Sequence, residues 1–154
     1  MAYKSSFLIE LEKLAQELQS SFAGIALQDG AGSDVHWRYA CGNRNEKYKK
    51  ISVRYGKGIA GKVISTGRAI QVDEFPKSIT GKAVEYPIML AEQLVSAYAV
   101  PLILAGQLKG VLLVGYHQQT EITQTLKDLV QNKALRIEDL YLSESQEGRT
   151  GDRV

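Results

Sequence analysis

The sequence predicts a single α+β domain, in which an antiparallel sheet carries an N-terminal and a C-terminal helix on one face. Amphipathic helical patterns occupy both ends of the chain. Two long apolar runs, residues 96–105 and 108–117, are separated only by a tight turn around Gly106, which can join antiparallel strands but not parallel ones. The length of 154 residues fits one core.

Composition limits the classes of protein to consider. Hydrophobic residues make up 44% and charged residues 23% of the chain, and the net charge is only +2, so no overall basic character indicates nucleic acid as a partner. No apolar run approaches the roughly 20 residues that cross a bilayer, and residues 1–14 mix charges with apolar residues, unlike a signal peptide. We therefore expect a cytoplasmic protein without a membrane segment.

The first half of the chain predicts one helix followed by short strands. Residues 7–18 place apolar side chains at intervals of three and four, as on one face of a helix. Residues 22–30 change to strand character and end in the turn signal Asp29-Gly30, and residues 34–42 follow as the partner strand of a hairpin. A brief alternation at residues 51–55 predicts another strand.

The second half repeats this mixture and ends in a long helix. A helix at residues 58–66, stopped by Gly67, precedes a short strand within residues 68–75 and a helix that begins at Pro87. After the 96–117 hairpin, residues 120–142 have helical spacing, with Thr120 as the expected cap. We expect one domain over residues 1–142 and a polar, loose tail over residues 143–154.

The stretch YGKGIAGKVISTG contains Gly56, Gly58 and Gly61 in the spacing G-x-G-x-x-G of dinucleotide-binding turns, and Asp73 follows. A dinucleotide site also needs a parallel strand before the glycines and a long crossover helix after them. Here Gly67 stops the helix early and the longest strands form an antiparallel hairpin. These features disfavour a dinucleotide site and favour a smaller role for the glycines.

Two roles for these glycines stay open. They can simply permit the turn and pack the helix on the sheet. Alternatively, the first NH groups of the helix, on Gly58, Ile59 and Ala60, have no partner within the helix and lie at its positive end, where they can bind an anion. Lys57 and Lys62 nearby are expected to be solvated and to contribute little.

A second helix entrance has similar character. Pro87 presets the backbone at the first helical position, which leaves the NH groups of Ile88 and Met89 as free donors, with Tyr86 just outside. Two such entrances facing one cavity would form a small anion site.

The stretch YGKGIAGKVISTGRAIQVDEF, followed by LVSAYAVPLILAGQLKGVLLVGY, resembles the pattern of GAF domains. The resemblance covers roughly residues 7–142. It implies a six-stranded antiparallel sheet with helices packed on one side and a ligand pocket on the other. Because a fold does not fix the ligand, the members of the family must be compared residue by residue.

Within the family, the chain is most similar to bacterial GAF nitrate receptors, whose pocket combines a tryptophan, backbone donors at the glycine-rich helix and a Tyr-x-Ile at the second helix. This resemblance implies nitrate as the ligand and no cofactor or metal. Trp37 fits either a core position or a wall of such a pocket. The implied ligand-binding residues are Trp37, Gly58, Ile59, Ala60, Tyr86, Ile88 and Met89.

The same resemblance implies a sensor histidine kinase of a nitrate-responsive two-component system as the partner, and a homodimer through the terminal helices is a further possibility. The alternative is a small enzyme related to the free methionine-R-sulfoxide reductases. Those enzymes use several cysteines, whereas this chain has only Cys41, so we expect no enzyme. The run NRNEKYKK, residues 43–50, is read as a solvated loop, with a partner contact as the alternative.

Overall fold

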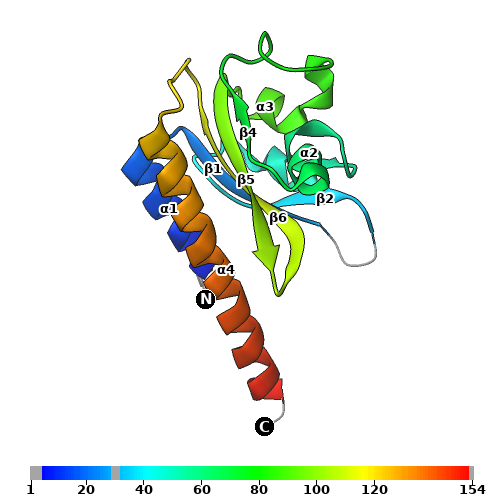
Figure 1. Ribbon diagram of the computed structural model, residues 1–154, viewed down its shortest axis with the longest axis vertical. Helices are drawn as coiled ribbons and strands as arrows, with labels where there is room; N and C mark the ends of the chain where they lie inside the picture. Colours follow the sequence, from blue (N-terminus) through cyan, green and yellow to red (C-terminus); the bar gives the residue numbers. More distant parts are fainter. Residues whose placement is uncertain (1–4, 29–31, 153–154) are drawn as a thin grey trace.

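The computed structural model describes residues 5–28 and 32–152, which include one six-stranded antiparallel sheet (Figure 1). Its spatial order is β3-β2-β1-β6-β5-β4, so β3 and β4 form the edges. The α+β class and the antiparallel sheet predicted from the sequence are confirmed. The strands are β1 (Phe22–Gln28), β2 (Val35–Cys41), β3 (Ser52–Val53), β4 (Ile70–Val72), β5 (Ser96–Leu104) and β6 (Gln107–Tyr116).

Helices cover both faces of the sheet. The terminal helices α1 and α4 lie side by side and pack on one face, as predicted, and the short helices α2 and α3 lie at the other (Figure 1). The helices are α1 (Ser6–Leu18), α2 (Gly58–Thr66), α3 (Pro87–Ala91) and α4 (Gln124–Asp152), with the 3-10 turns η1 (Glu46–Lys50) and η2 (Ala83–Glu85).

The central strand β6 shows why the long hairpin is apolar throughout. Val111 and Leu113 belong to the core under α2 and α3, whereas Leu112 and Val114 belong to the core under α1 and α4. Successive side chains of a strand point to opposite faces, so a sheet that is buried on both sides needs apolar residues at every position. The hairpin closes through Ala105 and Gly106, which both have positive φ values.

A charge cluster around the buried Glu10 joins the two terminal helices. The Glu10 carboxylate on α1 lies 2.7 Å from the Lys133 ammonium of α4, and the side chains of Lys13 and Arg136 lie within 4 Å of it. Burial raises the pKa of Glu10, but the hydrogen bond and charge of Lys133, together with the charges of Lys13 and Arg136, outweigh burial and lower it overall. The cluster therefore favours the ionised carboxylate.

The boundaries of α4 differ from the prediction at both ends. The hydroxyl of Thr123, not that of Thr120, accepts a bond from the first turn, at the Leu126 NH, and the helix begins at Gln124. At the other end the helix continues past Leu142 to Asp152, so the expected loose tail from residue 143 is helical over its described part. The predicted Asp29-Gly30 turn lies outside the described residues.

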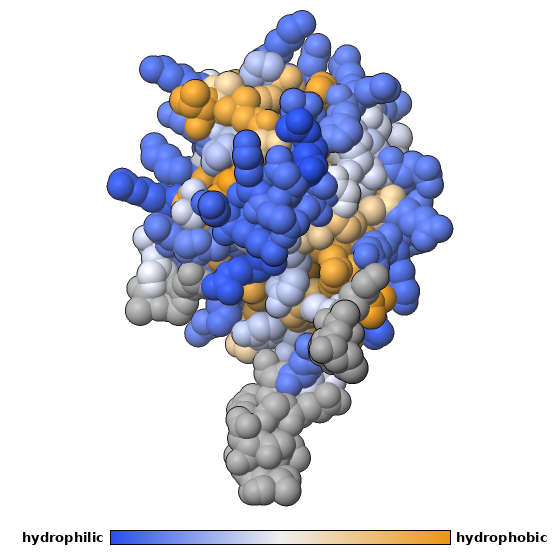
Figure 2. Space-filling model, turned by 180° about the vertical axis from the view of Figure 1, so that it is seen from behind, coloured by the Kyte–Doolittle hydropathy of each residue, from blue (hydrophilic) through white to orange (hydrophobic). Residues whose placement is uncertain are grey.

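Apolar surface shows in separate areas between hydrophilic side chains on the face in Figure 2. Across the described residues no helix is long and apolar enough to cross a membrane. The large apolar side chains that remain exposed are Ile9, Tyr55, Val84, Leu90, Ile103, Leu135 and Leu142.

Candidate functional site

The glycines of the G-x-G-x-x-G stretch hold the start of α2 against neighbouring backbone. Gly58 has a φ of +63°, and a Cβ there would lie 2.9 Å from Val53 Cγ1 and 3.1 Å from the Glu85 carbonyl oxygen. A Cβ on Gly61 would collide with the Arg54 carbonyl oxygen. Both positions therefore require glycine for packing, which is one of the two roles left open by the sequence.

The first turn of α2 is buried and lacks a side-chain cap. Lys57 occupies the N-cap position with extended backbone, and its side chain makes no capping hydrogen bond. The amides of Ile59 and Ala60 follow in the first turn, where a helix of nine residues presents its positive end. Gly67 ends the helix in a left-handed conformation, and its NH bonds to the Val63 carbonyl at 2.8 Å.

The second predicted entrance, at α3, is weaker than the first. Pro87 is the first helical residue, as predicted, and the N-cap residue Tyr86 also lacks a side-chain capping bond. However, α3 ends at Ala91 after five residues, so its dipole is small. Any anion held between the two helices would depend mainly on α2.

The structure brings the predicted ligand-binding residues together. Their side chains belong to one apolar cluster on the sheet face opposite α1 and α4, and Gly58 is buried at its border. Trp37, from β2, meets Phe22 edge to face at a centroid distance of 6.4 Å. Each of the clustered site side chains is at most 4% exposed: Trp37, Ile59, Ala60, Tyr86, Ile88 and Met89.

The polar contacts of Lys62 at this site were not predicted from the sequence. The Lys62 ammonium donates to the Tyr86 hydroxyl at 2.7 Å and to the Thr80 hydroxyl at 3.3 Å, and it lies 4.9 Å from the centre of the Tyr86 ring. The Tyr86 hydroxyl in turn donates to the Thr80 carbonyl at 3.0 Å. Lys62 is half-buried, so the expectation that it is solvated was wrong. Its place on α2 was predictable, but its partners come from a segment far along the chain.

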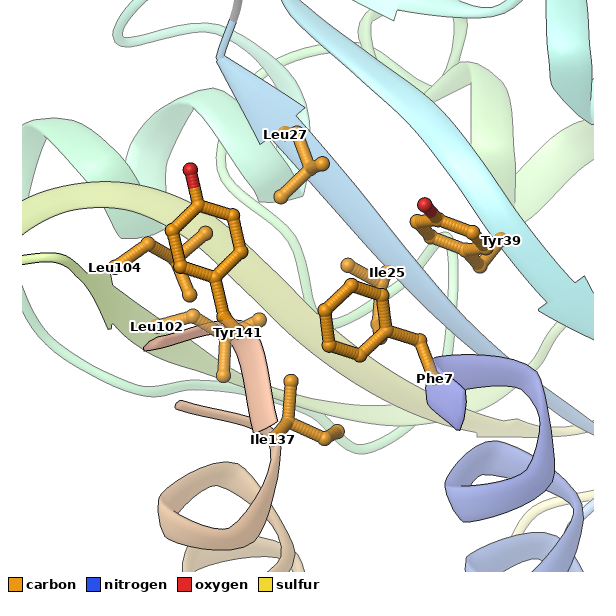
Figure 3. Close-up of a pocket in the computed structure, with 8 residues that line it drawn as sticks. All are labelled: Phe7, Ile25, Leu27, Tyr39, Leu102, Leu104, Ile137 and Tyr141. Carbon is orange, nitrogen blue, oxygen red and sulfur yellow. The ribbon is translucent and has the colours of Figure 1, made fainter. Parts of the chain in front are cut away.

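Among the described residues, three cavities can be named away from this cluster, and none of these three includes a clustered residue. One is an apolar crevice between the sheet and the α1–α4 pair, where Phe7, Ile137 and Tyr141 face strand side chains (Figure 3). It holds about 10 Å³, roughly the space of one water. A groove of about 550 Å³ near Asp73 and Glu121 carries carboxylates that repel anions. The third, at η1, is considered below.

Cys41 has the character of a structural thiol. Burial, and then the charge of Glu12, raise the pKa of its thiol, and the backbone bond to Ala23 only partly offsets this. A raised pKa keeps the thiol protonated, and the thiolate is the nucleophilic form. Within the described ranges, no group of three or more His, Cys, Asp or Glu residues could hold a metal ion.

Comparison with known proteins identifies a family and several similar structures. The family model of the GAF domain matches residues 10–134. A structure of a Staphylococcus aureus NreA protein mutated in its nitrate binding site is 33% identical, covers 77% of this chain and 88% of that one, and has a TM-score of 0.70.

Two further relatives are more distant. The free methionine-R-sulfoxide reductase of Neisseria meningitidis has a TM-score of 0.76 but only 16% identity, with coverage of 92% of this chain and 78% of that chain, and supports the fold alone. The transcriptional activator RamA of Corynebacterium glutamicum is 27% identical over 131 residues, which are 80% of this chain. The chain spans about half the length of that activator (46%).

Proposed function

The chain belongs to the GAF domain family, and from this premise we propose that it is a cytoplasmic receptor that binds nitrate and modulates a sensor histidine kinase. The observation that carries the proposal is the uncapped start of α2 beside a buried cluster that contains Trp37, Tyr86 and Ile88. The 33% identity to NreA, a protein described as having a nitrate binding site, supports it.

Nitrate suits this environment on physical grounds. It is flat, singly charged and weakly hydrated, so apolar walls such as Trp37 and Ile88 impose a small desolvation penalty. The amides of Ile59 and Ala60 supply donors at the positive end of α2, and Lys62 adds a positive charge next to Tyr86. Phosphate and sulfate, with higher charge and stronger hydration, fit the same apolar walls less well.

Ligand exchange requires a local opening. The clustered side chains are at most 4% exposed, so an anion cannot reach the α2 amides through the closed arrangement. The polar bonds among Lys62, Thr80 and Tyr86 fasten the segment before α3 to α2. We expect binding and release to involve transient separation of these groups.

We propose that the chain acts through another protein. The cluster offers donors and apolar walls but no nucleophile beside a base, so binding is its natural activity. The resemblance to GAF nitrate receptors indicates a sensor histidine kinase as that partner. Recovery of a kinase by affinity purification from native cells, with its autophosphorylation changed by nitrate, would support this part. A kinase that neither binds nor responds would contradict it.

A homodimer through α1 and α4 remains part of the proposal. These helices leave Ile9, Leu135 and Leu142 exposed, and apolar stripes of this kind pack well in helix pairs. Sedimentation analysis of the purified chain measures the state directly, and a monomer at high concentration would contradict this part.

The main test is thermal unfolding with different anions. A ligand that binds only the folded state at a hundredfold excess over Kd stabilises it by about 2.7 kcal/mol, which corresponds to about 5–10 °C in Tm. We expect a saturable increase with nitrate and a much smaller one with chloride or sulfate at equal concentration. Equal effects of the three anions would indicate a general salt effect and would contradict nitrate binding.

The alternative, a methionine sulfoxide reductase, has weaker support. It rests on a fold similarity at 16% identity, and the raised pKa of the half-buried Cys41 thiol disfavours thiolate chemistry. Reduction of free methionine sulfoxide by the purified chain, lost in Cys41→Ser, would establish the alternative and overturn the receptor proposal.

A further inference from the structure

A strongly basic surface surrounds η1 and the edge strand β3. Residues 44–57, here called the η1 surface, carry six basic side chains and one acidic side chain, so their formal charge is +5. Because the whole chain is +2, all other residues together sum to −3. The net positive charge of the protein therefore comes from this one stretch, since the remaining residues are net negative.

These basic side chains are available to a partner. All six are exposed: Arg44, Lys47, Lys49, Lys50, Arg54 and Lys57. Among the described residues, the pair of Lys49 with Glu46 is the only ion pair in the stretch. Lys47 and Lys50, with Asn45 and Glu46, line an open hollow of about 240 Å³. Like charges gathered in this way repel one another unless an acidic group lies opposite.

The surroundings also offer contacts that are not electrostatic. β3 is an edge strand of two residues, paired on one side with β2. Tyr55, two residues after its end, is 54% exposed, and Leu90 on α3, which packs against η1, is 46% exposed. At a protein interface an exposed tyrosine and an apolar side chain can supply affinity, while the surrounding charges supply orientation.

The η1 surface is connected to the candidate ligand site through α3. The Arg44 NH donates to the carboxylate of Glu92, the residue just after α3, at 2.8 Å. The Arg44 guanidinium donates to the carbonyl of Ala91, the last residue of α3, at 3.2 Å. Glu92 is fully buried, and its second oxygen, Oε2, has no hydrogen-bond partner among the described residues. The other end of α3 carries Ile88 and Met89 in the apolar cluster.

Any shift of α3 therefore reaches both sites. A five-residue helix moves as a unit, so a displacement at Ile88 changes the position of Glu92 and of the Arg44 backbone bonded to it. Because breaking that bond would leave a buried carboxylate with even fewer partners, Arg44 is expected to follow α3.

We propose that the η1 surface is the docking site for an acidic face of a partner protein, and that α3 transmits occupancy of the ligand site to it. The identification of that partner as the ligand-regulated kinase rests on the proposed function. A protein is favoured over nucleic acid because the remainder of the chain is net negative and would repel an extended polyanion. The exposed Tyr55 and Leu90 also suit a protein face.

The experiment is site-specific photo-cross-linking of the full chain in its native cells. A benzophenone amino acid replaces Lys50 in the η1 surface or, as control, exposed Thr125 on α4. Each is combined with Lys47→Glu and Arg54→Glu, or with a matched reversal of two exposed basic residues elsewhere, Arg68→Glu and Lys77→Glu. Cross-linked peptides are identified by mass spectrometry, and binding of a DNA duplex is measured by fluorescence anisotropy.

The expected result is one protein joined at position 50 through a segment rich in Asp and Glu. We expect its yield to fall by at least about fivefold with the Lys47 and Arg54 reversals, and to stay unchanged with the matched reversals. No protein adduct, adducts that survive the reversals, or a cross-linked segment without acidic residues would overturn the proposal. DNA binding that is lost with the reversals, in place of a protein adduct, would also overturn it in favour of nucleic acid.

Calorimetric titration of nitrate into the same variants separates the two proposals. If the unmodified chain does not bind nitrate, the proposed function is contradicted. In that case a cross-link at position 50 that is lost with the Lys47 and Arg54 reversals still supports the docking surface. Normal nitrate binding without an adduct contradicts only the docking surface.

Discussion

Removal of the Lys62 ammonium tests whether the polar cluster around Tyr86 belongs to the ligand site. In Lys62→Met the aliphatic stem is retained, but the bonds of 2.7 Å to the Tyr86 hydroxyl and 3.3 Å to the Thr80 hydroxyl are lost. The Tyr86 hydroxyl keeps its bond to the Thr80 carbonyl. The variant therefore loosens Tyr86 without leaving its hydroxyl unpaired.

The size of the effect can be worked from these contacts. A hydrogen bond to a charged group contributes about 1.5–3 kcal/mol, and Lys62 is half-buried, so water screens part of this. We expect a loss of about 1–2 kcal/mol in the free energy of unfolding, which is about 3–6 °C in Tm. If Tyr86 contacts nitrate, we also expect Kd to rise roughly tenfold, equivalent to about 1.4 kcal/mol.

Thermal unfolding and calorimetric titration of nitrate measure the two quantities. Lys57→Met is the matched control, because Lys57 is an exposed lysine at the N-cap of the same helix, and it should change either quantity by less than about 0.5 kcal/mol. Tyr86→Phe also removes the bond between Lys62 and Tyr86, together with the bond to the Thr80 carbonyl, and because the Lys62–Tyr86 bond is shared, the double variant should lose less than the sum of the two single losses. Equal behaviour of the Lys57 and Lys62 variants, or additive losses in the double variant, would refute the reasoning.

Three further predictions concern the helices. Ala60→Pro deletes an amide donor in the first turn of α2, so calorimetry should show a loss of nitrate affinity larger than the loss of stability, and full affinity would place the anion elsewhere. Gly61→Ala brings a Cβ against the Arg54 carbonyl and should lower the free energy of unfolding by about 2 kcal/mol or more. Gly67→Ala meets only a side chain at 3.4 Å and should lose about 1 kcal/mol because of its positive φ, so equal losses of the two variants in denaturant titration would contradict the contact of Gly61 with Arg54. Glu10→Gln should lower the free energy of unfolding by about 2 kcal/mol near neutral pH, because the paired carboxylate has a lowered pKa. The stability from this pair is present above the ordinary pKa of 4.5 and is lost as pH falls through the lower folded value, so the difference from the unmodified chain should shrink below about pH 4.5. A difference that is independent of pH would contradict the pairing with Lys133.

The candidate site could be predicted from sequence only in part. The helix starts at Gly58 and Pro87 carry local signals, and their geometry follows from a few neighbouring residues. That Trp37 joins them in one cluster was indicated by resemblance and not by any local pattern. The partners of Lys62 had no sequence signal, because Thr80 and Tyr86 reach it from a separate segment through the fold.

By itself the sequence determined the fold class, the number of strands through its resemblance, and the central hairpin, because apolar periodicity and turn residues act over a few neighbouring positions. Only the tertiary structure decided which of the charged side chains pair, that Gly58 and Gly61 are required by backbone from Glu85 and Arg54, and that η1 is joined to α3 through Arg44 and Glu92. Such contacts depend on how distant segments pack, and a lysine or glutamate on a helix has the same local pattern whether its partner is water or another segment of the chain.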